Sequence, residues 1–154
     1  MIKMSSMEKS AEAFFGSSAN EEMKQWEQSL KALFDQLEIW LKPLVAGGVA
    51  KITRVTKRKT ENPSPDVSVS YSTPMLIINF DRKTAVVDTI GLFVLNTDGR
   101  VVLIGDDKRF LMTRSLQPTE HWDTVTYLNI GDQTPSVERP LSEDALAEFL
   151  SHFM

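Results

Sequence analysis

The apolar positions between residues 20 and 44 recur with the period of one helix face. Asn20 can accept the first amide hydrogens of such a helix, and Glu21 and Glu22 suit the positive end of its dipole. The stripe alternates steps of three and four and is widened by a second column: Met23, Trp26, Leu30, Leu33, Leu37, Trp40 and Leu44, with Phe34 and Leu41. A stripe of this width favours packing across a sheet, whereas a dimeric coiled coil, the alternative, prefers a narrow seam.

A shorter helix is predicted over residues 5–15, with Phe14 and Phe15 on its apolar face. Gly16 is expected to end this helix, and the small polar residues that follow are expected to form a flexible link. An isolated helix of about eleven residues is marginal in water. The two phenylalanines must therefore dock on the chain's own domain, fray or bind a partner, and we take Phe14 and Phe15 as candidate binding residues.

The long helix is expected to stop or kink at Pro43, which lacks an amide hydrogen and disfavours helical geometry at Lys42. Gly47 and Gly48 then end the helical stretch. From Val49 onward the apolar period changes to two and β-branched residues become frequent, which is typical of strands. Strands are predicted over residues 49–60, 67–71, 75–80, 85–88, 92–95, 101–104, 110–112 and 122–130.

Turn signals separate these strands. Residues 62–66 are predicted to be a loop because they hold two prolines, and Pro74 is expected to bend the chain. The Asp-Gly pair within residues 96–100 predicts a tight hairpin that joins the apolar runs 92–95 and 101–104. Shorter polar turns are predicted at residues 81–84 and 105–108.

A closing helix is predicted to begin at Ser142, where Leu141 before the cap and Leu146 after it can form a hydrophobic staple. The order of helix, strands and helix predicts an α+β fold. We expect an antiparallel sheet of about six or seven strands with a long N-terminal amphipathic helix and a C-terminal helix packed on it. The chain divides into a short helix with a flexible lead, residues 1–19, and a single α+β domain, residues 20–154.

The composition excludes several classes of function. With 154 residues, 42% hydrophobic and 25% charged, the chain has the make-up of one ordinary soluble domain. It contains no cysteine, which excludes disulfide scaffolds, thiolate metal sites and cysteine nucleophiles. No apolar run approaches the roughly 20 residues of a membrane-spanning helix, and the amino terminus lacks the apolar segment of a secretory signal. We therefore expect a cytoplasmic protein without a membrane span.

Positive charge is concentrated in one segment of an otherwise acidic chain. The segment between residues 51 and 59 carries five cations and no acid: Lys51, Arg54, Lys57, Arg58 and Lys59. The net charge of −4 thus divides into +5 in this segment and −9 elsewhere. Such cations can simply protect a sheet edge, or they can dock an anionic partner, and we take these five as candidate binding residues. The acidic balance and the lack of interleaved aromatic residues make nucleic acid an unlikely partner.

One spacing resembles the metal-binding signature of the PD-D/ExK nuclease family. It comprises Pro65-Asp66, fourteen intervening residues, and Asp81-Arg82-Lys83. The resemblance implies that Asp66 and Asp81 hold a divalent metal and that Lys83 stabilises charge on a phosphate. The second acid and the lysine would have to project from one strand, whereas residues 81–84 are predicted to be a turn. We therefore keep a metal-dependent nuclease only as an alternative and take none of these residues as a site.

The sequence contains no other convincing catalytic or metal-binding constellation. Glu120, His121 and Asp123 cannot all reach one ion from a strand, because neighbouring positions point to opposite faces. We expect no metal and no cofactor. The preferred function is a non-enzymatic protein-binding domain, as in inhibitors, immunity-type proteins, chaperones and adaptors, and a homodimer remains open. The main alternative is a module that uses the basic segment to read a phospholipid, a nucleotide or an acidic peptide.

Overall fold

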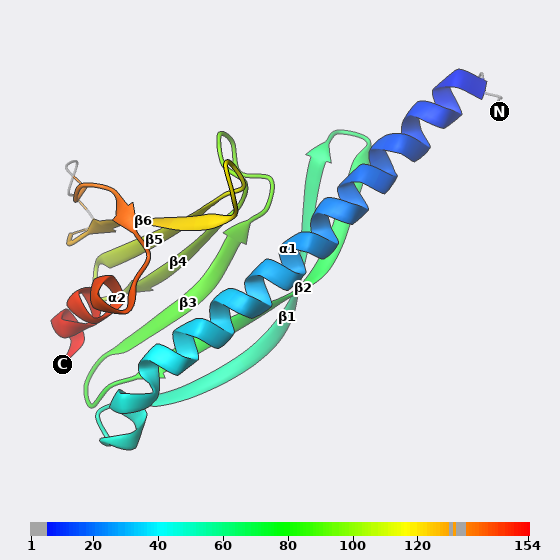
Figure 1. The fold of residues 1–154 in the computed structure, drawn as a ribbon. Helices are drawn as coiled ribbons and strands as arrows, with labels where there is room; N and C mark the ends of the chain where they lie inside the picture. The colour runs from blue at the N-terminus through cyan, green and yellow to red at the C-terminus, as the bar shows by residue number, and fades with distance from the viewer. Residues whose placement is uncertain (1–5, 130, 132–134) are drawn as a thin grey trace.

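The structure, a computed structural model, describes residues 6–129, 131 and 135–154, with side chains from residue 20 onward. A long helix, a sheet of seven strands and a short helix follow one another along the chain (Figure 1). The elements are α1 (Ser6–Ala46), β1 (Lys51–Ser64), β2 (Val67–Asn79), β3 (Thr84–Gly91), β4 (Arg100–Gly105), β5 (Lys108–Ser115), β6 (His121–Tyr127), β7 (Arg139–Pro140), α2 (Glu143–Leu150) and the 3-10 turn η1 (Ser151–Phe153).

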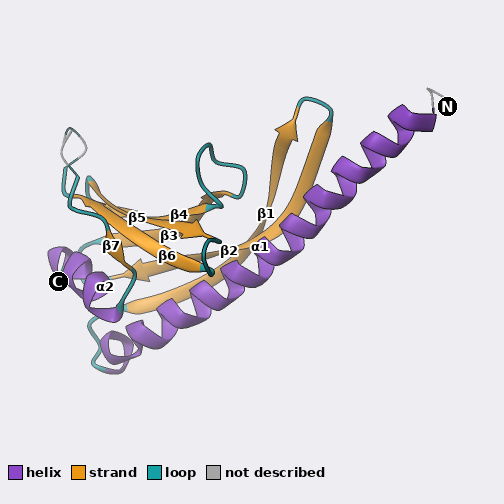
Figure 2. Cartoon of the chain, turned by 45° about the horizontal axis from the view of Figure 1, so that its top comes forward, coloured by secondary structure: helices purple, strands orange, loops and turns teal. Residues whose placement is uncertain are grey.

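The sheet is a simple antiparallel meander in the order β1-β2-β3-β4-β5-β6-β7. Every strand pairs with its neighbours in sequence, and α1 crosses the sheet while α2 packs beside the C-terminal end of α1 (Figure 2). The predicted α+β class, with helices at the two ends of the sequence, is confirmed. Because the meander has no closure, β1 is left as one edge of the sheet.

The apolar stripe of α1 is buried against the sheet. Its fully enclosed members are Trp26, Leu30, Leu33, Phe34, Leu37 and Leu41, and they share one core with residues of β2 to β5 and α2. Each large side chain buried in this way contributes roughly 1.5–3 kcal/mol. The predicted packing across a sheet is therefore confirmed, and this face is not free to form a coiled coil.

The helix α1 joins the two predicted helices, over residues 5–15 and from residue 20, into one continuous helix. It runs without a break through Gly16, because an interior glycine costs only about 1 kcal/mol and a packed segment supplies the nucleus from which a helix extends. It also continues three residues past Pro43, so of the stop or kink expected there the stop is wrong. Gly47 N–H donates to the Pro43 carbonyl at 3.0 Å, and Gly48, at a φ of 74°, provides the predicted exit.

The first turns of α1 extend past the tip of the β1–β2 hairpin (Figures 1 and 2). The side chains of Phe14 and Phe15 lie outside the described residues, so the proposed role of this pair stays a prediction. The predicted division into residues 1–19 and residues 20–154 stays a prediction as well, although the helical backbone is continuous across it.

The first hairpin is also longer than predicted. Residues 62–64, expected in a loop, belong to β1, with a register shift between Glu61 and Ser64. An edge strand tolerates Pro63 because an edge residue can leave its missing amide outside the ladder. The strand β2 runs through Pro74, where a bend was expected, but its buried side chains change phase there: Val69, Tyr71 and Thr73 before it, Leu76 and Ile78 after it.

The predicted strand at residues 92–95 is wrong. β3 pairs directly with β4, with Thr89 opposite Val101, and residues 92–99 form the loop between them. The N–H groups of Leu92 and Phe93 donate to the Glu61 carboxylate at 2.9 and 3.0 Å, so they are unavailable for a ladder. An apolar run therefore became a loop because a distant carboxylate binds its backbone.

The predicted β4–β5 turn and the cap of α2 are both confirmed. Asp106 and Asp107 adopt φ values of 49° and 65°, as the tight turn between these strands requires. Ser142 accepts a hydrogen bond from the Ala145 N–H at 3.0 Å and so caps α2. At this turn and this helix cap, the local sequence was sufficient to predict the structure.

Candidate functional site

The five cations of the basic segment all lie on β1, which pairs with β2 alone among the described strands. Two of them bind the protein's own acids. Arg54 Nη1 lies 2.8 Å from Asp35 Oδ1 and 2.5 Å from Glu38 Oε2, both on α1. Burial alone would lower the pKa of Arg54, but the hydrogen bonds to Glu38 and Asp35 outweigh it and raise that pKa. Arg54 is thus a link between β1 and α1.

The second internal pair joins Lys57 to Asp88 of β3 at 2.8 Å. Lys51, Arg58 and Lys59 have no carboxylate partner among the described residues. The structure therefore separates the predicted binding residues into two that pair with acids of α1 and β3 and three that have no acid partner among the described residues.

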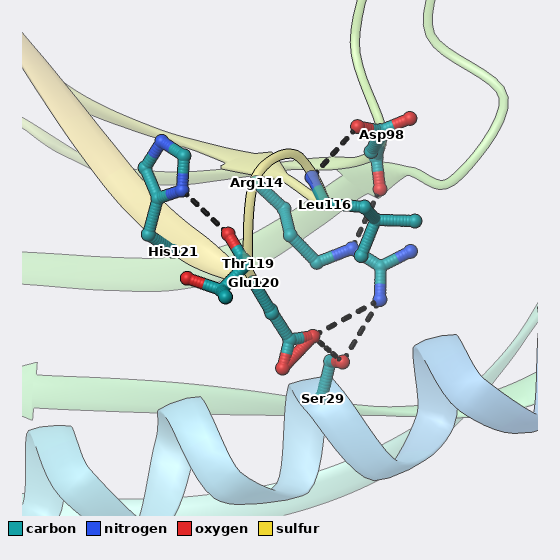
Figure 3. Close-up of polar contacts among 7 residues, drawn as sticks. All are labelled: Ser29, Asp98, Arg114, Leu116, Thr119, Glu120 and His121. Carbon is teal, nitrogen blue, oxygen red and sulfur yellow. Dashed lines mark hydrogen bonds and ion pairs between the residues drawn. The ribbon is translucent and has the colours of Figure 1, made fainter.

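A second candidate site surrounds Arg114 on β5, whose side chain is only 3% exposed (Figure 3). Its Nε donates to the Asp98 carbonyl at 2.7 Å and its Nη1 donates to Ser29 Oγ at 2.8 Å. Nη1 also lies 3.4 Å from Glu120 Oε2, and the Ser29 hydroxyl donates to the same carboxylate. One guanidinium therefore joins α1, β5, the β3–β4 loop and the residue before β6.

Aromatic contact completes the enclosure of Arg114. Its guanidinium carbon lies 4.8 Å from the centroid of a Trp26 ring, close enough for a cation–π interaction, and Trp122 packs on Trp26 with centroids 5.9 Å apart. Burial is the main cause that lowers the pKa of Arg114, and the nearby acids Glu120 and Asp98 oppose this effect. A guanidinium titrates so far above neutrality that the group stays charged.

A hollow of about 300 Å³ opens beside Arg114, between α1 and the β3–β4 loop, and we call it the Arg114 hollow. It is lined by Glu22, Gln25, Leu92, Phe93, Val94, Leu95, Thr97, Asp98, Arg114 and Leu116. Hydrogen bonds hold the lining residues of the hollow in place. Asp98 Oδ2 accepts the Leu116 N–H at 2.9 Å, and Thr97 Oγ1 donates to the Val94 carbonyl. The site combines one buried cation with an apolar wall.

The loop that forms this wall is held in place by Glu61. Besides the two backbone N–H groups of the loop, the Glu61 carboxylate accepts the hydroxyl of Tyr71. Burial, and then the hydrogen bond to Glu61, raise the pKa of Tyr71, and the nearby indole of Trp26 opposes that rise. The Trp26 indole N–H is nonetheless without a regular hydrogen bond among the described residues.

The residues of the nuclease-like spacing are not brought together. Asp66 lies in the β1–β2 turn and Asp81 in the β2–β3 turn, at opposite ends of a strand that spans roughly 40 Å. Lys83 pairs with Asp106 at 3.0 Å. Among the side chains that the structure describes, from residues 20–129, 131 and 135–154, no group of three or more from His, Asp or Glu could hold a metal ion.

Comparison with protein-family models, curated proteins and solved structures finds no match for this chain. No described helix has the length and apolar content needed to cross a bilayer. Functional conclusions must therefore rest on the residues of the two sites themselves.

Sequence reasoning missed Arg114 and Glu61, which organise the second site. One signal was available for Arg114: it follows Phe110 and Met112 at steps of two, which places a cation in phase with the buried face of β5. No local pattern marks Glu61, because the backbone groups that it binds lie 31 and 32 positions away.

Proposed function

We propose that this chain is a non-enzymatic protein-binding domain, and that the free edge of β1 receives an extended, acidic segment of its partner. The observation that carries the proposal is a 14-residue edge strand on which three cations have no acid partner among the described residues. Edge strands leave a row of backbone N–H and C=O groups available, and an added strand can pair with that row.

Charge argues for an acidic partner and against a second copy of this chain at that edge. A β1-to-β1 contact would bring the unpaired cations of two copies together, whereas acids that project from both faces of an extended partner would meet Arg58 and Lys59. A homodimer through another surface stays a prediction, as does the cytoplasmic location.

Small anions are less well suited to the same cations. Arg58 and Lys59 are neighbours on one strand and so project to opposite faces, which prevents them from clamping one phosphate. Arg54 and Lys57 are already bound to carboxylates. An extended partner that follows the strand can reach both faces, so this arrangement favours an acidic protein segment over a nucleotide or a lipid headgroup.

The test compares partner capture by three forms of the full chain from a lysate of its source cells. One form is unaltered, one carries Arg58→Glu and Lys59→Glu, and the matched control carries Lys42→Glu and Arg82→Glu. Lys42 and Arg82 are exposed and do not belong to β1, since they lie on α1 and in the β2–β3 turn. Both double variants change the net charge equally, so only the location of the change differs.

We expect the unaltered chain and the control to retain the same acidic protein, and the β1 variant to lose at least about tenfold of it. Retention should also fall as salt is raised, since exposed charges are screened. Equal capture by the β1 variant, or capture that both double variants lose equally, would contradict the proposal.

A further inference from the structure

The guanidinium of Arg114 retains donors that the protein does not use. An arginine has five N–H donors, and in this structure Nε and Nη1 have acceptors while Nη2 has none among the described residues. Figure 3 shows Nη2 on the side of the guanidinium that faces away from Ser29 and Glu120. That side is turned toward the β3–β4 loop, which forms the wall of the Arg114 hollow.

Nη2 retains some solvent-accessible surface. Among the described residues, the Trp26 indole nitrogen is the only fully enclosed side-chain nitrogen or oxygen without a hydrogen bond, so the unpaired Nη2 is not fully enclosed. Arg114 as a whole is 3% exposed, and its position is fixed by Ser29, Asp98 and Trp26. The Arg114 hollow is therefore lined by a charged hydrogen-bond donor, Arg114 Nη2, whose side chain is held in position.

The surrounding charges determine what that donor can accept. The acids that act on Arg114 are Glu120, Asp98 and Glu22, so the group as a whole is negative and repels a further anion. A neutral acceptor, such as a carbonyl oxygen, avoids this repulsion. Glu22, which is exposed at the hollow, can in turn accept a hydrogen bond from an N–H donor.

We propose that the Arg114 hollow binds a primary carboxamide group. The amide oxygen accepts from Arg114 Nη2, the amide NH₂ donates to Glu22, and the attached carbon chain contacts Leu95 and Leu116. These two side chains are 87% and 37% exposed and supply apolar surface at the site. A volume of about 300 Å³ matches a small group, such as an Asn or Gln side chain or a free small amide.

This inference goes beyond the proposed function and does not depend on it, because the hollow and the β1 edge share no residue. The test follows the Nε–H resonance of Arg114 by NMR in the intact protein during titration with three four-carbon probes: butyramide, butyrate and butylammonium. We expect a saturable shift with butyramide at millimolar concentration and none with the two ions. Tighter binding of butyrate than of butyramide, or no shift with any probe, would overturn the proposal.

A variant pair then checks the role of Glu22. Glu22→Ala removes the amide acceptor, and Glu21→Ala removes an equally exposed neighbouring charge that does not line the hollow. Butyramide affinity should fall several-fold in Glu22→Ala and stay unchanged in Glu21→Ala. An equal loss in both variants, or none in either, would contradict the assigned geometry.

Two peptide probes distinguish the sources of the amide. N-acetylglutamine methylamide carries a side-chain carboxamide, and N-acetylleucine methylamide carries backbone amides only. Binding of the glutamine probe alone supports a partner's Asn or Gln side chain, and binding of butyramide but neither peptide supports a free small amide. Equal binding of both peptides would overturn the assignment to a primary carboxamide.

Discussion

Two arginines connect the sheet to α1, and they do so in contrasting ways. Arg54 on β1 and Arg114 on β5 both reach the helix and both lie over an aromatic ring, Phe34 at 5.8 Å and Trp26 at 4.8 Å. Arg54 binds two carboxylates and its side chain is 29% exposed, whereas Arg114 binds mainly neutral oxygens and is 3% exposed.

The environments shift the two pKa values in opposite directions. Burial lowers the pKa of Arg114, because its neutral acceptors compensate little for lost water, while the two acids raise the pKa of Arg54 despite its partial burial. Similar helix-to-sheet contacts therefore contribute differently to stability, depending on how far the arginine is buried. Arg54 is a replaceable surface link, and Arg114 is a structural centre whose loss would remove a donor from the buried Ser29 hydroxyl and from the half-buried Asp98 carbonyl.

Replacing the buried Arg114 tests that contrast directly. Arg114→Met should lower the free energy of unfolding by about 3 kcal/mol, because the Asp98 carbonyl and the Ser29 hydroxyl lose their donor and Trp26 loses its cation. Urea denaturation followed by tryptophan fluorescence measures the change. A loss of less than about 1 kcal/mol would show that the buried arginine is not a structural centre.

A substitution in the β3–β4 loop, which lines the Arg114 hollow, should lower stability nearly as much. A Cβ added to Gly99 would lie 2.5 Å from the Trp26 ring. Gly99 also has a φ of 125°, a backbone conformation that residues other than glycine rarely adopt. Gly99→Ala should therefore cost about 2 kcal/mol in a thermal or urea melt. Gly131→Ala is a suitable comparison, because no atom of the described residues lies within 4 Å of its added Cβ, and its stability should be close to that of the unaltered chain.

Tyr71→Phe should cost about 1.5 kcal/mol at neutral pH, since a hydroxyl bound to the Glu61 carboxylate is lost. The raised pKa of Tyr71 means that the folded state holds its phenol proton more tightly than the unfolded state does. The associated stability is complete below the ordinary pKa of 10 and is lost as pH rises above it. Urea melts between pH 8 and 11 should accordingly show the two proteins converging at high pH, and a constant difference would contradict the account.

The corresponding substitution at Arg54 should have only a small effect on stability. Arg54→Met should change the free energy of unfolding by less than about 1 kcal/mol, because ion pairs open to solvent contribute little. The same substitution at two arginines thus isolates the effect of burial. If both variants lost the same stability in urea melts, the contrast between the two regions would be wrong.

Local chemistry predicted much of the fold. The stripe of α1, the Asp106-Asp107 turn and the Ser142 cap each depend on residues close in sequence, and each is confirmed. Predictions were wrong where contacts between residues distant in sequence determine the local structure. The apolar residues 92–95 form a loop because Glu61 binds the backbone N–H groups of this segment. Pro63 lies in a strand because β1 is at the edge of the sheet.

For the candidate sites too, the sequence predicted what depends on neighbouring residues and not what depends on distant ones. The basic segment was visible as a run of charge, but its division into paired and unpaired cations depends on acids of α1 and β3 that only the folded chain brings near. The Arg114 hollow needs residues from α1, the β3–β4 loop and β5, so no single stretch of sequence contains its pattern.

The central claim, that β1 is an open edge that pairs with an acidic partner, is tested most directly by hydrogen exchange. Amides of residues 51–64 should be compared by mass spectrometry in the free chain and in its complex with the captured partner. Pairing of the partner with β1 predicts slower exchange concentrated in this strand on binding, because outward N–H groups gain acceptors. Unchanged exchange across residues 51–64, with protection elsewhere on the molecule, would contradict it.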